Sequence, residues 1–221
     1  MHAAVAKILQ SPNALTIAQE LQQAVTDEAK RRHAFREWLD EDKKAEFING
    51  EVVIMHSPVK KRHSRVSKLL TRLAGVYAEI KGIGEIMYEK ALIALTRNDY
   101  EPDMVFYRKE EADKQTDDQM IFPAPSFVVE ILSKSTAKYD KGIKKQDYAA
   151  HGIEEYWIID PVKQQIEQYL LIGNGSEYMP PYVFLYEDNI ESAVITGFNI
   201  PVAALFDEAI NLQTLKQLMG K

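Results

Sequence analysis

The stretch Phe127-Val128-Val129-Glu130-Ile131-Leu132 sets a single acid inside an apolar run. A second stretch, Glu101-Pro102-Asp103-Met104-Val105-Phe106-Tyr107, sets Asp103 directly before another apolar run. Both are rich in β-branched and aromatic residues and are bounded by proline or charged residues, which is typical of short buried strands. A buried carboxylate is costly unless its charge is compensated, and two carboxylates on adjacent strands repel each other. Because a divalent cation is the usual compensation, the two stretches predict a metal site at Asp103 and Glu130.

The elements around these two strands alternate between helical and extended patterns. Apolar residues at helical spacing predict helices over residues 59–81 and 140–151. Runs of β-branched and aromatic residues predict strands near residues 85–95, 101–107, 126–132 and 155–160. The resulting order of helix, three strands, helix and strand predicts an α/β fold in which helices flank a mixed sheet.

Two hairpins and a long loop are predicted outside this order. Residues 45–55 form one hairpin around Asn49-Gly50, the strongest signal for a two-residue turn. Residues 165–172 and 181–186 form the other, and the polar residues 109–119 are long enough to suggest a functional flap.

The two ends of the chain read as helical additions. Helices are predicted at residues 14–31 and, as a separate short piece, at 35–39, and one or two short helices at 200–221. We therefore divide the chain into a helical extension at 1–44, a central domain at 45–206 and a helical tail at 207–221.

Composition limits the chemistry. With 221 residues, 46% of them hydrophobic, the chain can bury one sizeable core. The absence of cysteine excludes disulfides, cysteine-ligated zinc, iron–sulfur clusters and a thiol nucleophile. No apolar run approaches the roughly 18 residues of a membrane span, and the N-terminus is too weakly apolar for a signal peptide. We expect a soluble cytoplasmic protein with no membrane partner.

Charge is distributed unevenly along the chain. The net charge of −6 argues against a nonspecific polyanion binder, yet basic residues crowd residues 60–72 and 134–145. The candidate DNA contacts in these segments are Lys60, Lys61, Arg62, His63, Lys138 and Lys141. The alternative is that each basic run is simply a solvated helix surface.

Several blocks of sequence resemble the PD-(D/E)XK restriction-endonuclease-like superfamily, and more closely its Uma-type branch. The matching residues are Glu101-Pro102-Asp103, the block 125–137, Asp140, Lys144, Tyr148 and the block 152–161. Together with the hairpin at 46–51, the resemblance covers residues 45–206. It implies a restriction-endonuclease-like fold and a metal-dependent endonuclease that hydrolyses DNA phosphodiester bonds with Mg²⁺ or Mn²⁺. A homodimer is plausible, because duplex cleavage needs two sites and symmetric dimers are common.

The resemblance also implies roles for individual residues. Asp103 and Glu130 would ligate the metal directly, with the carbonyl of Ile131 as a further ligand. The superfamily places a lysine where this chain has Leu132, so Lys144 on the following helix would supply the missing cation. Glu46 would join these residues as a fourth catalytic group.

Each candidate has a plainer explanation. Asp103 could cap or form the turn after Pro102. Lys144 could be a surface lysine, and Glu46 could be an exposed hairpin residue. His63 could be incidental. We expect Asp140 to cap the N-terminus of its helix. Tyr148 and Trp157 read as core residues, although the Tyr148 hydroxyl could reach the acids.

Two other functions compete with a nuclease. The first is a nucleic-acid-binding or scaffold protein that keeps the fold without turnover, which Leu132 and the acidic net charge favour. The second is a metal-dependent hydrolase of another phosphoester. DNA binding that weakens steeply with salt would distinguish the nuclease and the nucleic-acid-binding protein from a hydrolase of another phosphoester. Metal-dependent DNA cleavage would then distinguish the nuclease from the binding protein without turnover.

Overall fold

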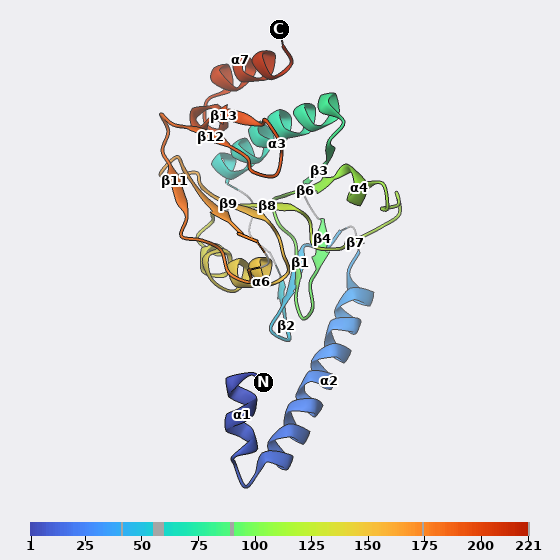
Figure 1. Ribbon diagram of the computed structural model, residues 1–221. Coiled ribbons are helices and arrows are strands. Elements are labelled where there is room, and N and C mark those ends of the chain that lie inside the picture. The colour runs from blue at the N-terminus through green and yellow to red at the C-terminus, as the bar shows by residue number, and fades with distance from the viewer. Residues whose placement is uncertain (41, 55–59, 89–90, 174, 221) are drawn as a thin grey trace.

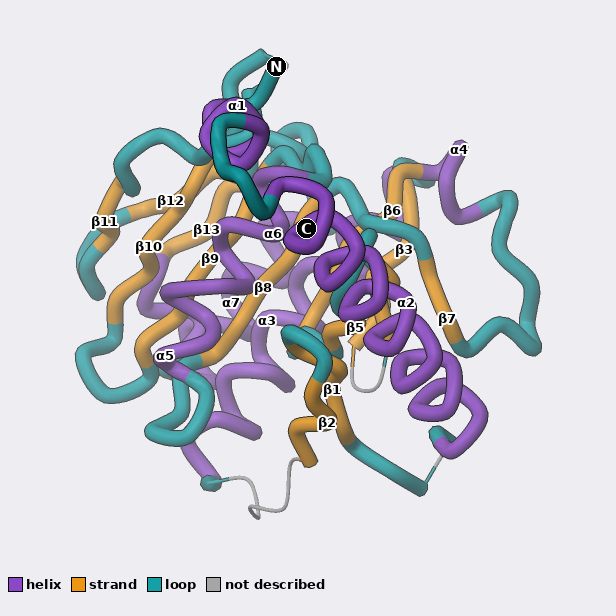
Figure 2. The backbone as a smooth tube through the Cα atoms, turned by 90° about the horizontal axis from the view of Figure 1, so that it is seen from below, coloured by secondary structure: helices purple, strands orange, loops and turns teal. Residues whose placement is uncertain are grey.

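A six-stranded mixed sheet forms the centre of the protein. Figure 2 shows its strands side by side, from β11 at one edge to β3 at the other. The computed structural model describes residues 1–40, 42–54, 60–88, 91–173 and 175–220. The strands, in spatial order, are β11 (Tyr182–Phe184), β10 (Gln165–Leu170), β9 (Glu155–Asp160), β8 (Phe127–Ile131), β6 (Met104–Arg108) and β3 (Gly84–Tyr88). Strands β8 and β9 run parallel, and the other neighbours are antiparallel. The predicted mixed sheet is therefore present, and its neighbouring strands β8 and β6 carry the two apolar runs that predicted it.

A second sheet of five strands lies beside the first. Its order is β2 (Glu51–Ile54), β1 (Ala45–Ile48), β5 (Asp99–Tyr100), β4 (Leu92–Ala94) and β7 (Ile121–Phe122). The β1–β2 hairpin turns at Asn49 and Gly50, whose φ angles of 52° and 85° are those of the predicted two-residue turn. The last predicted hairpin residue, 55, lies outside the described residues. The single strand predicted at 85–95 is wrong, because β3 and β4 belong to different sheets.

Helices cover the two faces of the six-stranded sheet (Figure 1). Helices α3 (Lys61–Lys81) and α7 (Glu208–Leu218) lie over one face, together with the short pair β12 (Asn189–Glu191) and β13 (Asn199–Pro201) and the 3₁₀ turn η2 (Val202–Leu205). The predicted 140–151 helix lies over the other face as three pieces, α5 (Ala137–Tyr139), the π-helical turn η1 (Asp140–Lys144) and α6 (Lys145–Ala150). The predicted loop at 109–119 begins with a helical turn, α4 (Lys109–Ala112).

Alternate residues of the central strands enter two separate cores. Phe127, Val129 and Ile131 pack under α3, whereas Val128 packs with Tyr148 on the opposite side of the sheet. Side chains alternate along a strand, so Glu130 shares the face of Val128 and points towards α6. This alternation decides on which side of the sheet the acid lies.

The N-terminal arm consists of α1 (Ala3–Leu9) and α2 (Ala14–Trp38), which project from the body in Figure 1. The separate helix predicted at 35–39 is instead the end of α2, because no helix-breaking residue interrupts 32–38. Arg32 and Arg36 both pair with the fully buried Asp99 of β5, at 2.6 and 2.7 Å. Phe35 packs on Phe47 of β1, so the end of α2 is fixed to the hairpin that carries Glu46.

Among the described residues, none of the helices is both long enough and apolar enough to cross a bilayer.

We predict that Asp99→Ala destabilises the protein by about 3–5 kcal/mol, because it leaves two arginines without their buried partner. Asp113→Ala is the matched control, since Asp113 pairs with Lys109 on the surface, where such a pair contributes at most about 1 kcal/mol. Urea unfolding of both variants measures the difference. Equal destabilisation of the two variants would show that the arm is held by packing alone.

Candidate active site

A cavity of about 600 Å³ opens where β8 ends. Its wall combines residues of β1, the segment before β6, the start of α3, the segment from β8 to α5, and the turn after β9. Asp103, Glu130, Lys144 and Glu46, the four predicted catalytic residues, all line it, as does Ile131. Residues that lie up to about a hundred positions apart in the sequence therefore share one cavity.

Strand pairing brings Asp103 and Glu130 together. Met104 pairs with Val129 across the antiparallel β6 and β8, so Asp103, one residue earlier, lies opposite Glu130, one residue later. Directly opposed residues point to the same face, with Cβ atoms about 5 Å apart. The Ile131 N–H donates to Asp103 Oδ2 at 2.7 Å, which ties the acid to the end of β8.

Asp103 also contacts the first turn of α3. Its Oδ2 lies 3.2 Å from His63 Nε2, and both side chains are largely buried. Burial alone would raise the pKa of Asp103, but the hydrogen bond and charge of His63, together with the Ile131 N–H and Lys44, outweigh it, and the pKa lies below its usual value. Asp103 is therefore an ionised carboxylate near neutral pH.

Lys144 lies at the centre of the remaining acids. Its Nζ is 2.6 Å from Glu46 Oε1, 2.9 Å from Glu130 Oε1 and 3.5 Å from Asp140 Oδ1. The Tyr148 hydroxyl donates to the same Glu130 oxygen at 3.0 Å. Within the described residues, Lys144 is the one lysine or arginine that is fully buried. The alternative of a surface lysine does not fit this position.

The wide turn η1 explains how Lys144 reaches the site. Gly142, with φ −110° and ψ −105°, interrupts the helix between α5 and α6. Asp140 and Lys144, four residues apart on this turn, both point inward and are buried. The predicted N-cap role of Asp140 is wrong: the residue at the N-cap of α5 is Thr136, and the Asp140 side chain faces Lys144 instead.

Glu46 is buried rather than exposed on its hairpin. Its Oε1 accepts from the Glu101 N–H at 3.0 Å as well as from Lys144. Among the described residues, no donor satisfies its second oxygen, Oε2. A buried carboxylate oxygen with no donor is a position where a cation or a water would supply the missing partner.

The cluster holds more negative than positive charge. Three carboxylates, on Glu46, Glu130 and Asp140, surround one ammonium group, and a fourth, on Asp103, pairs with His63. Burial, together with the neighbouring acids, raises the pKa of Glu130 well above its usual value despite the attraction of Lys144. Burial likewise raises the pKa of Asp140 to about 6. The attraction of Glu130 and Glu46 outweighs burial at Lys144 and raises its pKa, so Lys144 stays protonated.

This donor set fits a divalent cation of the Mg²⁺ type. Carboxylate and carbonyl oxygens are hard ligands, and Mg²⁺ keeps several waters, so two carboxylates and one carbonyl are sufficient. In the part of the chain that the structure describes, no three histidine, aspartate or glutamate side chains are grouped to chelate an ion by themselves. The fit therefore rests on Asp103, Glu130 and the Ile131 carbonyl, and on the excess of carboxyl groups over cationic groups in the cluster around Lys144.

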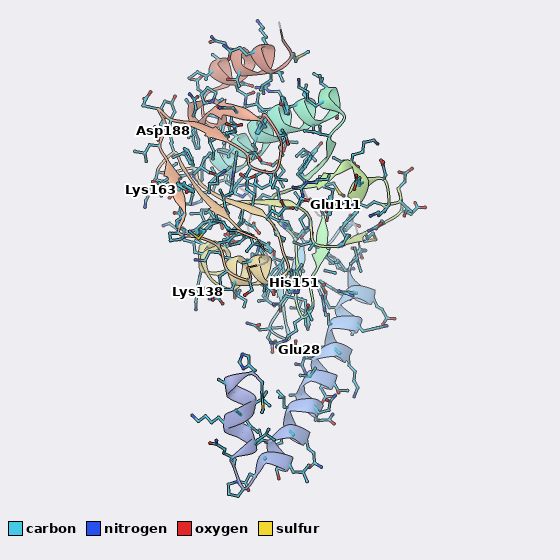
Figure 3. The ribbon with its side chains drawn as sticks, viewed as in Figure 1. Glu28, Glu111, Lys138, His151, Lys163 and Asp188 are labelled. Atoms are coloured by element: carbon cyan, nitrogen blue, oxygen red, sulfur yellow. The ribbon has the colours of Figure 1, made fainter. Side chains whose placement is uncertain are left out.

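The predicted DNA contacts divide into two groups. Lys60, Arg62 and His63 line the cavity, joined by Lys44 and Lys134. Lys61 is exposed but does not line it. Lys141 pairs with Glu167 at 2.5 Å, and Lys138 is exposed on the surface of the molecule (Figure 3). We define the basic rim of the cavity as Lys44, Lys60, Arg62 and Lys134. Of these four, only Lys60 and Arg62 were among the predicted DNA contacts.

Sequence reasoning missed several cavity residues. Lys44 was not singled out, Lys134 lies in the basic segment 134–145 but was not among the named DNA contacts, and Glu101 was noted only as the neighbour of Pro102 and Asp103. Asp140 and Tyr148, which contact Lys144 and Glu130, were already singled out in the sequence; they lie four residues before and after Lys144, on the same side of a helix.

Sequence comparison identifies the group to which this chain belongs. Residues 32–203 match the sequence model of the Uma2 family, described as "Putative restriction endonuclease". The chain belongs to the Uma2 family. The match includes every cavity residue, and it confirms the resemblance to the Uma-type branch that the sequence blocks indicated.

Two proteins are similar to this Uma2 chain, one in sequence and one in fold. The "Uncharacterized protein sll1609" of Synechocystis sp. is 31% identical over 139 residues, which cover 59% of this chain and 74% of that protein. A crystal structure of "a putative nuclease belonging to DUF820" from Anabaena variabilis has a TM-score of 0.67 at 17% identity, covering 82% of this chain and 96% of that one. At this identity the likeness concerns the fold, and it confirms the restriction-endonuclease-like architecture.

We predict that Asp140→Asn stabilises the metal-free protein at neutral pH. The Asp140 pKa is higher in the folded protein, about 6 against 3.8, so its contribution is most favourable at low pH and is lost as pH rises through this interval. The uncharged variant should gain about 1–3 kcal/mol near pH 7 and nothing near pH 4.

Melting curves at the two pH values measure this gain, with the exposed Asp118→Asn as control. A variant that is less stable than the wild type near pH 7 would show that the attraction between Asp140 and Lys144 dominates.

Proposed function

We propose that this chain is a metal-dependent endonuclease that hydrolyses DNA phosphodiester bonds. The observation that carries the proposal is the placement of Asp103 and Glu130 in one cavity, where β6 begins and β8 ends, beside the buried Lys144. Membership of a family described as "Putative restriction endonuclease" supports the same reading. The basic rim above these acids suits a phosphate backbone.

Asp103, Glu130 and the Ile131 carbonyl would hold the metal. When bound, Mg²⁺ or Mn²⁺ supplies charge neutralisation at the phosphoryl oxygens and an activated water. The Ile131 N–H and His63 fix the orientation of Asp103, and the Tyr148 hydroxyl fixes that of Glu130. The ligands are thus positioned by hydrogen bonds from three different elements.

Lys144 contributes a fixed positive charge rather than a base. Its pKa is raised by Glu130 and Glu46, so it does not accept a proton near neutral pH. An ammonium beside the phosphoryl group stabilises the negative charge that develops there during attack. Glu46 holds the ammonium in place at 2.6 Å, which makes it a positioning residue in this proposal.

A nucleic-acid-binding protein without turnover is the second candidate. The observation that favours it is Leu132, which lines the cavity where the superfamily has its lysine. Lys144 occupies the neighbouring space from a different element, and for this reason the enzyme remains our first choice. Cleavage of both strands of a duplex would require two chains, and a homodimer stays a prediction.

Incubation of supercoiled plasmid with Mg²⁺ or Mn²⁺ tests the proposal. We expect nicking by the wild type and loss of nicking, by at least about a hundredfold, in Glu130→Gln. Glutamine keeps an oxygen that accepts from Lys144 and Tyr148, so the fold is retained while the ligand charge is lost.

Glu191→Gln, the same change at an exposed acid outside the cavity, is the matched control and should nick normally. If the wild type nicks no DNA with either metal but binds it, the chain is the second candidate.

A further inference from the structure

We propose that the cavity receives an unpaired nucleotide, with its sugar and base against an apolar wall and its phosphate at the acids. The apolar wall consists of Ile54, Leu132, Pro161 and Val162, all of which line the cavity. The inference rests on the proposed nuclease function and names the form of DNA that this site takes.

The ends of two parallel strands build most of the apolar wall. Leu132 follows β8, and Pro161 and Val162 follow β9. The Leu132 N–H donates to the Ile159 carbonyl at 2.9 Å, so these residues leave the sheet at the same edge. Ile54, at the end of β2, reaches the cavity from the other sheet.

The turn after β9 holds Val162 in the solvent. Asp160 Oδ1 accepts from the N–H groups of Val162 and Lys163 at 2.8 and 3.0 Å, which fixes the turn. Val162 is 68% exposed and Ile54 is 44% exposed. A single exposed apolar residue is ordinary, but four that line one cavity beside buried acids form a surface suited to an apolar group of a ligand. Figure 3 labels Lys163 on this turn, at the periphery of the molecule.

The apolar wall begins directly beside the acids. Leu132 lies two residues after Glu130 and so on the same side of β8. A phosphate beside Lys144, whose Nζ lies 2.9 Å from Glu130, would therefore have the aliphatic side chain of Leu132 next to it. In a nucleic acid, the group that adjoins the phosphate is the sugar and, if the nucleotide is unpaired, its base.

Depth favours an unpaired nucleotide over an intact duplex. Glu46 and Glu130 are only 1% and 4% exposed, so a phosphate must enter the cavity to approach them. A volume of about 600 Å³ is in the range of pockets that enclose small ligands. In a duplex the bases are stacked and paired, and enzymes that take a base into a pocket act on single strands or extrude the nucleotide.

Fluorescence anisotropy with three labelled DNA probes tests the inference. The probes are a single strand, the same strand in a full duplex, and that duplex with a central run of mismatches. Binding is measured at one salt concentration in metal-free buffer with a chelator, so that cleavage does not compete. We expect the wild type to bind the single strand and the mismatched duplex at least about tenfold more tightly than the full duplex.

Two double variants separate the apolar wall from the basic rim. Ile54→Ser/Val162→Ser should weaken binding of the unpaired probes about tenfold and that of the full duplex by less than about twofold. Lys60→Ala/Arg62→Ala should weaken all three probes together and make the salt dependence shallower, because phosphate contacts do not distinguish paired from unpaired bases. The matched control is Ile172→Ser/Leu185→Ser, at residues that are 65% and 56% exposed and do not line the cavity.

Equal wild-type affinity for the single strand and the full duplex would overturn the inference, as would the same loss in the control as in Ile54→Ser/Val162→Ser. Tight binding of the single strand but not of the mismatched duplex supports the inference. It would show that the unpaired nucleotide comes from single-stranded DNA rather than from a mismatched region of a duplex. The nuclease proposal fails separately, through the absence of plasmid nicking, because the ranking of probes is measured without turnover.

Discussion

The rest of the site depends on one interaction, the ion-pair cluster around the buried Lys144. One ammonium lies within 3.5 Å of three carboxylates from β1, β8 and the turn η1. Removing such a charge from water is costly unless its partners are well placed, so the cluster requires the two sheets and the helical segment to meet at this point. The fold and the site are therefore specified together.

The cluster has more carboxylates than it can neutralise. The raised pKa values of Glu130 and Asp140 show that burial favours the protonated form of these acids in the absence of a further cation. Asp103, paired with His63, stays ionised at the edge of the same cavity. A divalent ion at Asp103 and Glu130 would remove this imbalance, which links the electrostatics of the protein to the chemistry that we propose.

The sequence predicted the parts of this arrangement that follow from local pattern. The apolar runs around Asp103 and Glu130 predicted both strands, and Asn49-Gly50 predicted the hairpin. The break between β3 and β4 was not predictable, because a change of sheet leaves no mark on the alternation of side chains. The inward position of Asp140 depends on the irregular turn at Gly142. The ordinary preference of aspartate for the N-cap therefore led to a wrong prediction for this residue. The roles of the site residues remain predictions.

The most direct test of this account is the melting temperature of the metal-free protein as Mg²⁺ or Mn²⁺ is added. An ion that binds only the folded protein raises its stability with concentration. We predict a saturable rise in the wild type and none in Asp103→Asn, whose amide oxygen still accepts from the Ile131 N–H but lacks the charge. A wild-type melting temperature that does not change with either metal, or that rises equally in Asp103→Asn, would contradict the account.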